Sequence, residues 1–538
     1  MARETMTGET TNGQAIDGRA IDGQAIDGQA IDGHAATVPY RGLITVCAMM
    51  ATLMQSLDST IANVALPYMQ GSLSASSDQI TWVLTSYITA AAIMTAPVGW
   101  LSARFGLKRL YLISMIGFTA ASMLCGIAGS LTEMVVFRLL QGVFGAALVP
   151  LSQSTMLNIY PPERRGSAMA IWGMGVMVGP ILGPTLGGYL TELYDWRWVF
   201  FVNLPFGVLA TAGMAAFLPG TPASYRKFDW VGFGALAMGI GGLQLMLDRG
   251  ETQDWFGSTE IIVEAAAAVL GFYLFIVHMM TAERPFITPR IFRDRNLNAG
   301  LLVMFAVGMV LLAVSALLAP WLQNLADYPV ETAGLAMAPR GLGTMMAMMV
   351  AGRLSNRIDP RLLMAAGILL LAFSLYRMTG WTPAVDDMTV IINTMLQGAG
   401  LGLVFVPLQV IAFATLEPSL RTEGTALLSL VRNVGSAIGI SVTSALVTRT
   451  GQVEHAVLSG YATPLNRAFE GSAAALMPTT PQGAQMLDAM ISRQAEIIAY
   501  NNDWKLMMLT ALPMLLLLPL MRRPAVTSGT KAEHAVID

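Results

Sequence analysis

Long apolar runs alternate with short polar turns along the chain from Leu43 onward. Each run has roughly 18 to 25 residues, the length that an α-helix needs to cross the hydrocarbon core of a bilayer. The pattern therefore predicts an all-α membrane protein with about fourteen transmembrane helices. We place these spans near residues 43–68, 79–101, 110–130, 134–157, 167–190, 199–218, 230–248, 260–280, 298–320, 333–352, 362–380, 388–410, 425–448 and 504–521.

Cations are unevenly distributed between the turns. If the N-terminus is cytoplasmic, the cytoplasmic turns receive most of the arginines and lysines, and the opposite side receives few. The positive-inside rule then predicts that both termini are cytoplasmic. A reporter fused after Arg523 is expected to be cytoplasmic, and one fused near Ser472 is expected to be external.

Composition supports the membrane assignment. Hydrophobic residues make up 54% of the 538 residues and charged residues 12%, about half the usual share in soluble proteins, and the mean hydropathy is +0.58. The formal net charge of -3 gives no reason to expect a nucleic-acid partner. Cys47 and Cys125 lie in apolar spans, so no disulfide framework is expected. The 4 histidines show no metal-ligand spacing, and catalytic motifs are lacking, so we expect neither an enzyme nor a cofactor.

Asp58 and Arg138 are charged residues inside predicted spans. A charge at bilayer depth is costly, so such residues are functional candidates. Burial raises the pKa of a carboxylate and a nearby cation lowers it, so an aspartate whose distance to a cation varies can take up and release a proton. Asp58 shares a helical face with Gln55 and Ala62. We predict that Asp58 and Arg138 couple transport to protons, although their spacing does not establish whether they meet.

The span near 167–190 carries glycines at every fourth position. They are Gly175, Gly179, Gly183 and Gly187. This spacing puts them on one helical face, where another backbone can approach closely. Pro180 and Pro184 remove backbone donors and favour bends.

These residues also carry a family resemblance. Arg138-Leu-Leu-Gln141-Gly142 resembles the fourth-helix motif of major facilitator superfamily transporters, and the glycines and prolines above, with Gly188, resemble the fifth-helix antiporter motif. Residues 57–67 (LDSTIANVALP) resemble the EmrB/QacA branch, and 196–203 (WRWVFFVN) its EmrB-like members. The resemblance implies a drug:H+ antiporter of 14 spans, with the major facilitator fold of two six-helix bundles plus two inserted helices.

An internal repeat supports the two bundles. Gly99-x-Leu-Ser-x-Arg104 recurs as Gly352-x-Leu-Ser-x-Arg357, and Thr394 stands where the first half has Arg138. The predicted domains are a disordered cytoplasmic tail with Gly-Gln-Ala-Ile-Asp repeats at 1–42, a six-helix bundle at 43–218, two inserted helices at 219–296, a second bundle at 297–522 with an external loop at 451–502, and a cytoplasmic tail at 523–538.

Other polar residues in the spans are candidates for a substrate pathway between the bundles. They are Gln55, Asn63, Gln141, Gln153, Gln397, Gln409, Arg432 and Asn433. Arg340 either lines the second bundle or extends its side chain to the interface.

The turn between the second and third spans resembles the cytoplasmic gate loop of the superfamily. Its candidate gate residues are Gly99, Arg104, Gly106, Lys108 and Arg109. The family usually has an acid where this chain has Ala103. The charge interaction of this loop that is credited with stabilising the outward-facing state in the family is therefore in doubt for this chain. A purely topogenic role for the cations remains open.

The predicted external loop at 451–502 is long, and long ordered loops tend to be functional. Residues 485–500 place methionines and isoleucines among polar residues, a pattern that predicts a short amphipathic helix. EmrB-like transporters work with a periplasmic membrane-fusion adaptor and an outer-membrane channel. The resemblance therefore implies that the loop helps to dock such an adaptor, in the inner membrane of a double-membraned bacterium; a free solvated loop is the alternative.

The sequence thus predicts a proton-coupled multidrug efflux permease that works by alternating access. Its partners would be small hydrophobic or amphipathic substrates, protons and membrane lipids. One alternative is export of an endogenous metabolite such as a siderophore or fatty acid. The other is a non-transporting membrane sensor or scaffold.

Overall fold

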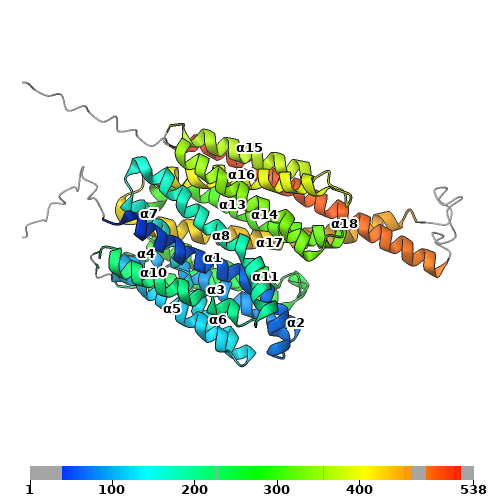
Figure 1. Cartoon of the computed structure of the whole chain (residues 1–538), viewed down its shortest axis with the longest axis horizontal. Coiled ribbons are helices and arrows are strands. Elements are labelled where there is room, and N and C mark those ends of the chain that lie inside the picture. Colours follow the sequence, from blue (N-terminus) through cyan, green and yellow to red (C-terminus); the bar gives the residue numbers. More distant parts are fainter. Residues whose placement is uncertain (1–38, 222, 225–226, 356, 463–479, 523–538) are drawn as a thin grey trace, which may run out of the picture. The chain divides into compact units, whose positions relative to one another are not determined.

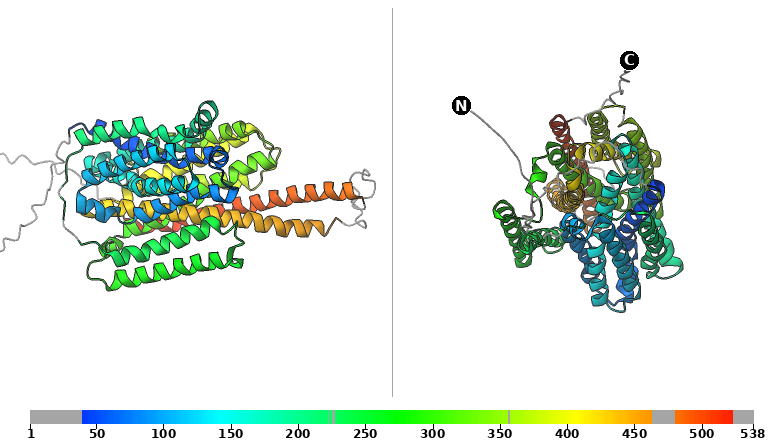
Figure 2. Two further views of the ribbon diagram at one scale, coloured as in Figure 1. Left: turned by 90° about the horizontal axis from the view of Figure 1, so that it is seen from below. Right: turned by 90° about the vertical axis from the view of Figure 1, so that its left-hand side faces the viewer.

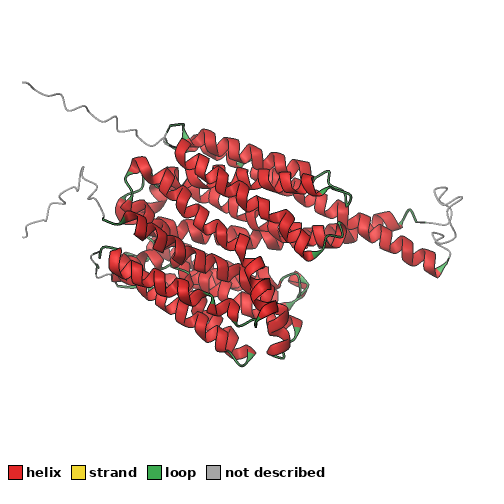
Figure 3. Cartoon of the chain, in the orientation of Figure 1, coloured by secondary structure: helices red, strands yellow, loops and turns green. Residues whose placement is uncertain are grey.

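Helices form all the regular structure in the part of the chain that the computed structural model describes (Figure 3). The described residues are 39–221, 223–224, 227–355, 357–462 and 480–522. The N-terminal repeats, the C-terminal tail and the segment around Ser472 lie outside these residues.

The first group of helices runs from Arg41 to Phe217 (Figure 1). Its elements are α1 (Arg41–Ser72), α2 (Ser77–Ile80), α3 (Trp82–Thr95), α4 (Val98–Phe105), α5 (Leu107–Ile127), α6 (Leu131–Gly145), α7 (Leu148–Ile159), η1 (Pro162–Arg164), α8 (Arg165–Leu193), α9 (Trp198–Phe201) and α10 (Asn203–Phe217). α1 packs between α8 and α10, and α6 packs against α3 and α5. α3 and α4 meet at a bend of 60°, because Pro97 between them cannot donate a backbone hydrogen bond.

Two helices lie between the bundles in sequence: α11 (Trp230–Arg249) and α12 (Thr259–Thr281), with the turn η2 (Trp255–Gly257). Asp229 caps α11 by accepting a hydrogen bond from the Gly232 N–H at 2.9 Å. α12 packs along α11, and α11 contacts α3. A groove of about 470 Å³ between the two helices is lined mainly by apolar side chains, including Trp230. Figure 2 shows this pair beside the remaining helices.

The second group of helices begins after the short turn η3 (Pro289–Arg293). It comprises α13 (Arg295–Pro320), η4 (Trp321–Leu325), α14 (Val330–Leu354), α15 (Pro360–Met378), α16 (Asp387–Ala412), η5 (Pro418–Leu420), α17 (Arg421–Ser459), α18 (Pro481–Ala511), α19 (Met514–Leu517) and η8 (Leu518–Leu520). α14 packs along α16, and α13 packs along α17. Aspartates cap α13 and α16: Asp294 accepts from the N–H of Leu297, and Asp386 from that of Thr389.

The number of spans is compatible with the prediction. Within the described residues, 12 helical stretches are long and apolar enough to cross a membrane, or up to 13 with the bent α3–α4 pair. The predicted span near 333–352 corresponds to α14, which has 25 residues. α14 lies outside that count because it carries Arg340 and Arg353 among alanines and glycines of low hydropathy.

The described part of the external loop predicted at 451–502 is mostly helical, which corrects that prediction, and the amphipathic helix predicted within it at 485–500 lies inside α18. α17 continues to Ser459 with 39 residues, and α18 begins at Pro481 with 31. The two helices extend side by side beyond the others (Figure 2), and His455 of α17 meets Asp488 of α18 at 3.0 Å. Hydropathy identifies only the part of a helix that lies in lipid, so the polar continuation was assigned to a loop.

Candidate functional site

The two predicted coupling residues meet in the first bundle. Asp58 lies on α1 and Arg138 on α6, 80 positions apart in the sequence. The Arg138 Nη1 atom lies 2.7 Å from the Asp58 Oδ2 atom, and both side chains are 0% exposed. A buried ion pair of this kind exists only where both charges are paired and hydrogen-bonded.

Two side-chain amides complete the surroundings of the carboxylate. Gln141 Nε2 donates to Asp58 Oδ1 at 2.8 Å, and Asn203 Nδ2 donates to the same oxygen at 3.1 Å. Gln141 Oε1 in turn accepts from Arg138 Nη1 at 2.8 Å. Asp58 therefore accepts hydrogen bonds from three donors, on Arg138, Gln141 and Asn203.

The guanidinium of Arg138 has further partners. Its Nε donates to the Val83 carbonyl oxygen at 3.1 Å, and its Cζ lies 4.3 Å from the ring centre of Tyr87 and 5.6 Å from that of Phe200. Such cation–π contacts favour a cation in a site without water. Gln55 Nε2 reaches the Tyr87 hydroxyl at 3.5 Å. A line of polar contacts thus leads from the half-buried Gln55 toward the ion pair.

Sequence reasoning missed part of this site. Asn203, Tyr87 and Ser122 were not candidates, yet Asn203 touches the carboxylate, and Ser122 Oγ lies 3.0 Å from Asn203 Nδ2. Asn203 is the first residue of α10 and closes the EmrB-like stretch at 196–203, which is the one signal that pointed to it. Tyr87 and Ser122 lie in apolar runs, and no sequence pattern relates them to Asp58.

Several predicted pathway residues lie elsewhere. Gln153 of α7 and Gln409 of α16 are hydrogen-bonded to each other across the two bundles. Gln397 Nε2 donates to the Met378 sulfur at 3.9 Å. Asn63 is exposed. It lies five positions after Asp58 on the same helix, and this spacing places the two side chains on different faces. The structure therefore does not join Asn63 to the ion pair.

Two arginines of the second bundle are held by neutral groups. Arg340 donates to Ser315 Oγ at 2.5 Å and to the Leu311 carbonyl oxygen at 2.8 Å. Arg432 Nη2 donates to Asn433 Oδ1 at 3.3 Å. Within the described part of the chain, neither arginine forms an ion pair with a carboxylate. The second bundle thus carries two cations without the neutralisation seen at Arg138.

The glycines of the antiporter motif face α1. A Cβ atom at Gly179 would lie 2.7 Å from the Ser56 carbonyl carbon, one at Gly187 would lie 2.9 Å from Ile61 Cγ1, and one at Gly183 would clash with the Thr60 side chain. Ser56 Oγ donates across the contact to the Val176 carbonyl oxygen at 2.9 Å. Gly188 is different, because nothing lies within 4 Å of its Cβ position. The motif therefore lets α8 lie directly against the helix that carries Asp58.

The predicted gate loop touches the second bundle. A Cβ atom at Gly99 would lie 2.8 Å from the Glu423 Cα atom at the start of α17. Gly106 has a φ of 83°, a backbone angle that residues other than glycine rarely adopt. The next residue, Leu107, donates its N–H to Thr221 Oγ1 at 2.8 Å. Thr425 Oγ1 also donates to the Pro150 carbonyl oxygen at 3.1 Å. The bundles are thus closed against each other at this end.

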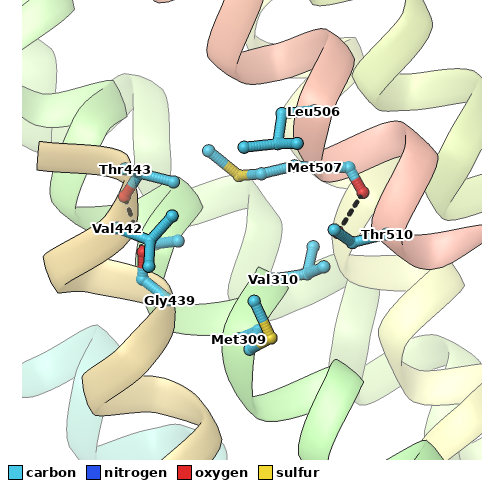
Figure 4. Close-up of a pocket in the computed structure, with 9 residues that line it drawn as sticks. Met309, Val310, Gly439, Val442, Thr443, Leu506, Met507 and Thr510 are labelled. Atoms are coloured by element: carbon cyan, nitrogen blue, oxygen red, sulfur yellow. Dashed lines mark hydrogen bonds between the residues drawn. The ribbon is translucent and has the colours of Figure 1, made fainter. Parts of the chain in front are cut away.

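A small cavity lies between α13, α17 and α18 (Figure 4). It measures about 20 Å³, and its walls include Met309, Val442 and Leu506. The hydroxyls of Thr443 and Thr510 turn to carbonyl oxygens of their own helices, at 2.8 Å each. Such a space holds at most about one water molecule, so it is not a substrate site.

Comparison with known proteins decides the family. Residues 48–440 match the profile of the Major Facilitator Superfamily. The chain belongs to this superfamily. The prediction made from the motifs of the fourth and fifth spans is confirmed.

Two relatives of this superfamily member match it over most of their length. Multidrug export protein EmrB of Escherichia coli (strain K12) is 36% identical over 466 residues, which cover 86% of this chain and 91% of that protein. Fatty acid resistance protein FarB of Neisseria gonorrhoeae is 35% identical over 469 residues, with 85% and 92% covered.

A solved structure supports the fold. The proton:xylose symporter XylE bound to 6-bromo-6-deoxy-D-glucose matches with a TM-score of 0.57 and 14% identity, over 89% of this chain and 96% of that chain. At this identity the likeness concerns the major facilitator fold alone. The chain is thus a multi-pass membrane protein with this fold.

Proposed function

We propose that the chain is a proton-coupled multidrug efflux permease, which exports hydrophobic or amphipathic compounds in exchange for protons. The observation that carries the proposal is the buried Asp58–Arg138 pair at 2.7 Å. The relatives EmrB and FarB, matched over most of the chain, support export as its activity. An intramembrane carboxylate held by a cation is the chemistry that a proton relay requires.

In the proposed cycle, the conformation described above holds Asp58 in its charged form. Protonation removes the charge that holds Arg138, so the contact between α1 and α6 weakens. α1 also lies against the glycine face of α8, so a shift of α1 is transmitted to a helix that approaches the second bundle. The bundles are closed at the end that carries Gly99, predicted to be cytoplasmic, and rocking of one bundle against the other gives alternating access.

Export of amphipathic acids such as fatty acids is a second candidate, and a specific observation favours it. Arg340 and Arg432 have only neutral hydrogen-bond partners among the described residues. A desolvated cation without a counter-charge attracts an anionic group. The relative FarB, a fatty acid resistance protein, supports this alternative.

The hairpin of α17 and α18 supports a role in docking an adaptor of the membrane-fusion type that connects to an outer-membrane channel. Apolar side chains are exposed along it: Val453, Val457, Tyr461, Met486 and Met490. Exposed apolar patches of this kind mark interaction sites. With an adaptor, the permease would lie in the bacterial inner membrane with both termini in the cytoplasm. Reporters fused after Arg523 and near Ser472 test this orientation.

Purified protein in liposomes tests the proposed function. An outward-directed proton gradient should drive accumulation of a fluorescent substrate, because protons leave as substrate enters, and addition of substrate should move protons. A sensor or scaffold would move neither. Parallel assays with a lipophilic cation and with a fatty acid distinguish the two export candidates, and a growth-inhibition panel on cells with and without the protein identifies the substrates.

A further inference from the structure

Asn203 differs from the other donors to Asp58. Its side chain is 0% exposed, and Nδ2 donates to Asp58 Oδ1 and to Ser122 Oγ, at 3.1 and 3.0 Å. Its Oδ1 atom, in contrast, has no hydrogen-bond partner among the described residues. A charged carboxylate only accepts hydrogen bonds, so the amide must turn its NH₂ group toward Asp58 in this state. A buried acceptor without a partner is costly, and this one lies on the side chain that touches the ionisable group.

The amide of Gln141 is hydrogen-bonded through both its nitrogen and its oxygen, whereas that of Asn203 is hydrogen-bonded through its nitrogen alone among the described residues. Gln141 donates to Asp58 with Nε2 and accepts from Arg138 with Oε1. Turning Gln141 would set oxygen against oxygen at Asp58 and N–H against N–H at Arg138. Turning Asn203 breaks no bond at its Oδ1, because none exists there. Asn203 is therefore the amide that can reverse its direction while the ion pair keeps its geometry.

Protonation of Asp58 reverses the requirement at this position. Oδ2 is held by Arg138 at 2.7 Å, so the incoming proton goes to Oδ1. The new hydroxyl needs an acceptor, yet Oδ1 faces only the N–H groups of Gln141 and Asn203. The charged and titratable groups that face Asp58 are Arg138 of α6, Tyr87 of α3 and Cys125 of α5; the Tyr87 hydroxyl is joined to Gln55 and the Cys125 thiol to Gln141 rather than to Asp58 Oδ1. The glycine face of α8 offers no side chain.

We propose that Asn203 is a positioning residue for proton coupling, whose side-chain amide turns over when Asp58 is protonated so that its Oδ1 accepts the hydrogen bond of the new hydroxyl. The inference rests on the proposed function of Asp58. Ser122 completes the change: its hydroxyl, which donates to the Phe200 carbonyl oxygen at 2.8 Å, can donate to Asn203 Oδ1 instead. The proton comes from water and ends on Asp58, and Asn203 itself changes no charge.

Infrared difference spectra of the purified protein between acidic and alkaline pH test this directly. The C=O stretch of a protonated carboxyl group appears at low pH, and Asp58→Asn assigns it to Asp58. Asn203→Leu keeps the size of the side chain but offers no acceptor, so the band should move to higher frequency. Asn203→Asp offers an acceptor that repels the charged form of Asp58, because two adjacent carboxylates resist joint ionisation. The midpoint of the pH titration should therefore rise by about one unit or more.

Asn393 provides the matched control. It is also 0% exposed and its Oδ1 also lacks a partner, but its Nδ2 donates to the Ser374 carbonyl oxygen at 3.2 Å and no carboxylate is involved. Asn393→Leu and Asn393→Asp should leave the band and its midpoint unchanged. An unshifted band in Asn203→Leu, or an unshifted midpoint in Asn203→Asp, would overturn the amide switch. A titrating band that persists in Asp58→Asn would instead overturn the proposed role of Asp58, and with it the premise of the inference.

Discussion

Replacing Gly179 by alanine should separate α1 from α8 and weaken the coupling pair. The added Cβ atom would lie 2.7 Å from the Ser56 carbonyl carbon, whereas ordinary contacts begin at 3.4 Å. The obstacle is backbone, so no side-chain rotation relieves it, and α1 must move by about 0.7 Å, the difference between these two distances. Ser56 lies two residues before Asp58. A shift of this size would stretch the 2.7 Å contact between Asp58 and Arg138 beyond the usual range of a strong hydrogen bond.

Gly188→Ala is the matched control for this prediction. It lies on the same helix, and nothing lies within 4 Å of its Cβ position. Both substitutions gain about 1 kcal/mol of helix propensity, so this contribution cancels in the comparison. Overpacking costs about 1–3 kcal/mol, and we expect Gly179→Ala to be less stable than Gly188→Ala by that amount.

Two measurements check the comparison. Thermal unfolding in detergent reports the stability difference, and drug efflux from cells at matched expression reports coupling. We expect Gly188→Ala to export like the wild type and Gly179→Ala to export less. Equal stability and equal efflux of the two variants would refute the account of the α1–α8 contact.

Three further predictions concern other parts of the molecule. Gly99→Leu should hold the bundles apart at Glu423, so a cysteine introduced at a nearby position between the bundles should react faster with a thiol reagent than it does without this substitution. Gly42→Leu is the control, because nothing lies within 4 Å of its Cβ position. Equal reaction rates in the two variants would contradict the closed gate. Arg340→Gln should reduce export of amphipathic acids more than export of lipophilic cations, and an equal reduction of both would argue against an anion-attracting role. Met486→Glu should weaken co-purification of an adaptor from membranes, whereas Gln482→Glu, at another exposed position of α18, should not; full recovery with both variants would leave the hairpin without that role.

The fold was largely predictable because transmembrane helices follow from hydropathy and length. Hydropathy failed where a helix leaves the lipid, so the polar continuations of α17 and α18 were assigned to a loop, and only the amphipathic pattern at 485–500 indicated part of α18. It also hid Asp503, which is 2% exposed and lies one residue before the predicted last span. Asp503 lies inside α18, and an acid buried by packing against other helices has the same local sequence as an acid exposed to water.

The candidate site was predictable only in part. Asp58, Arg138 and Gln141 stood out because charge and amide groups are costly in apolar spans. Their meeting could not be predicted, since α1 and α6 are brought together by packing that no local pattern encodes. Asn203 lay outside the candidates for the same reason: its partner is 145 positions away in the sequence.

The central claim is that Asp58 carries the proton that drives export. Asp58→Asn keeps the size of the side chain and cannot change charge, but it leaves the buried Arg138 without a counter-charge. Loss of one partner of a buried pair costs about 3–5 kcal/mol, so the assay must also report folding. In liposomes, substrate exchange between the two sides serves this purpose because it needs no proton. The account predicts that Asp58→Asn retains exchange and loses accumulation driven by a proton gradient. Proton-driven accumulation at the wild-type level, with an unchanged pH profile between about pH 5 and 9, would contradict it.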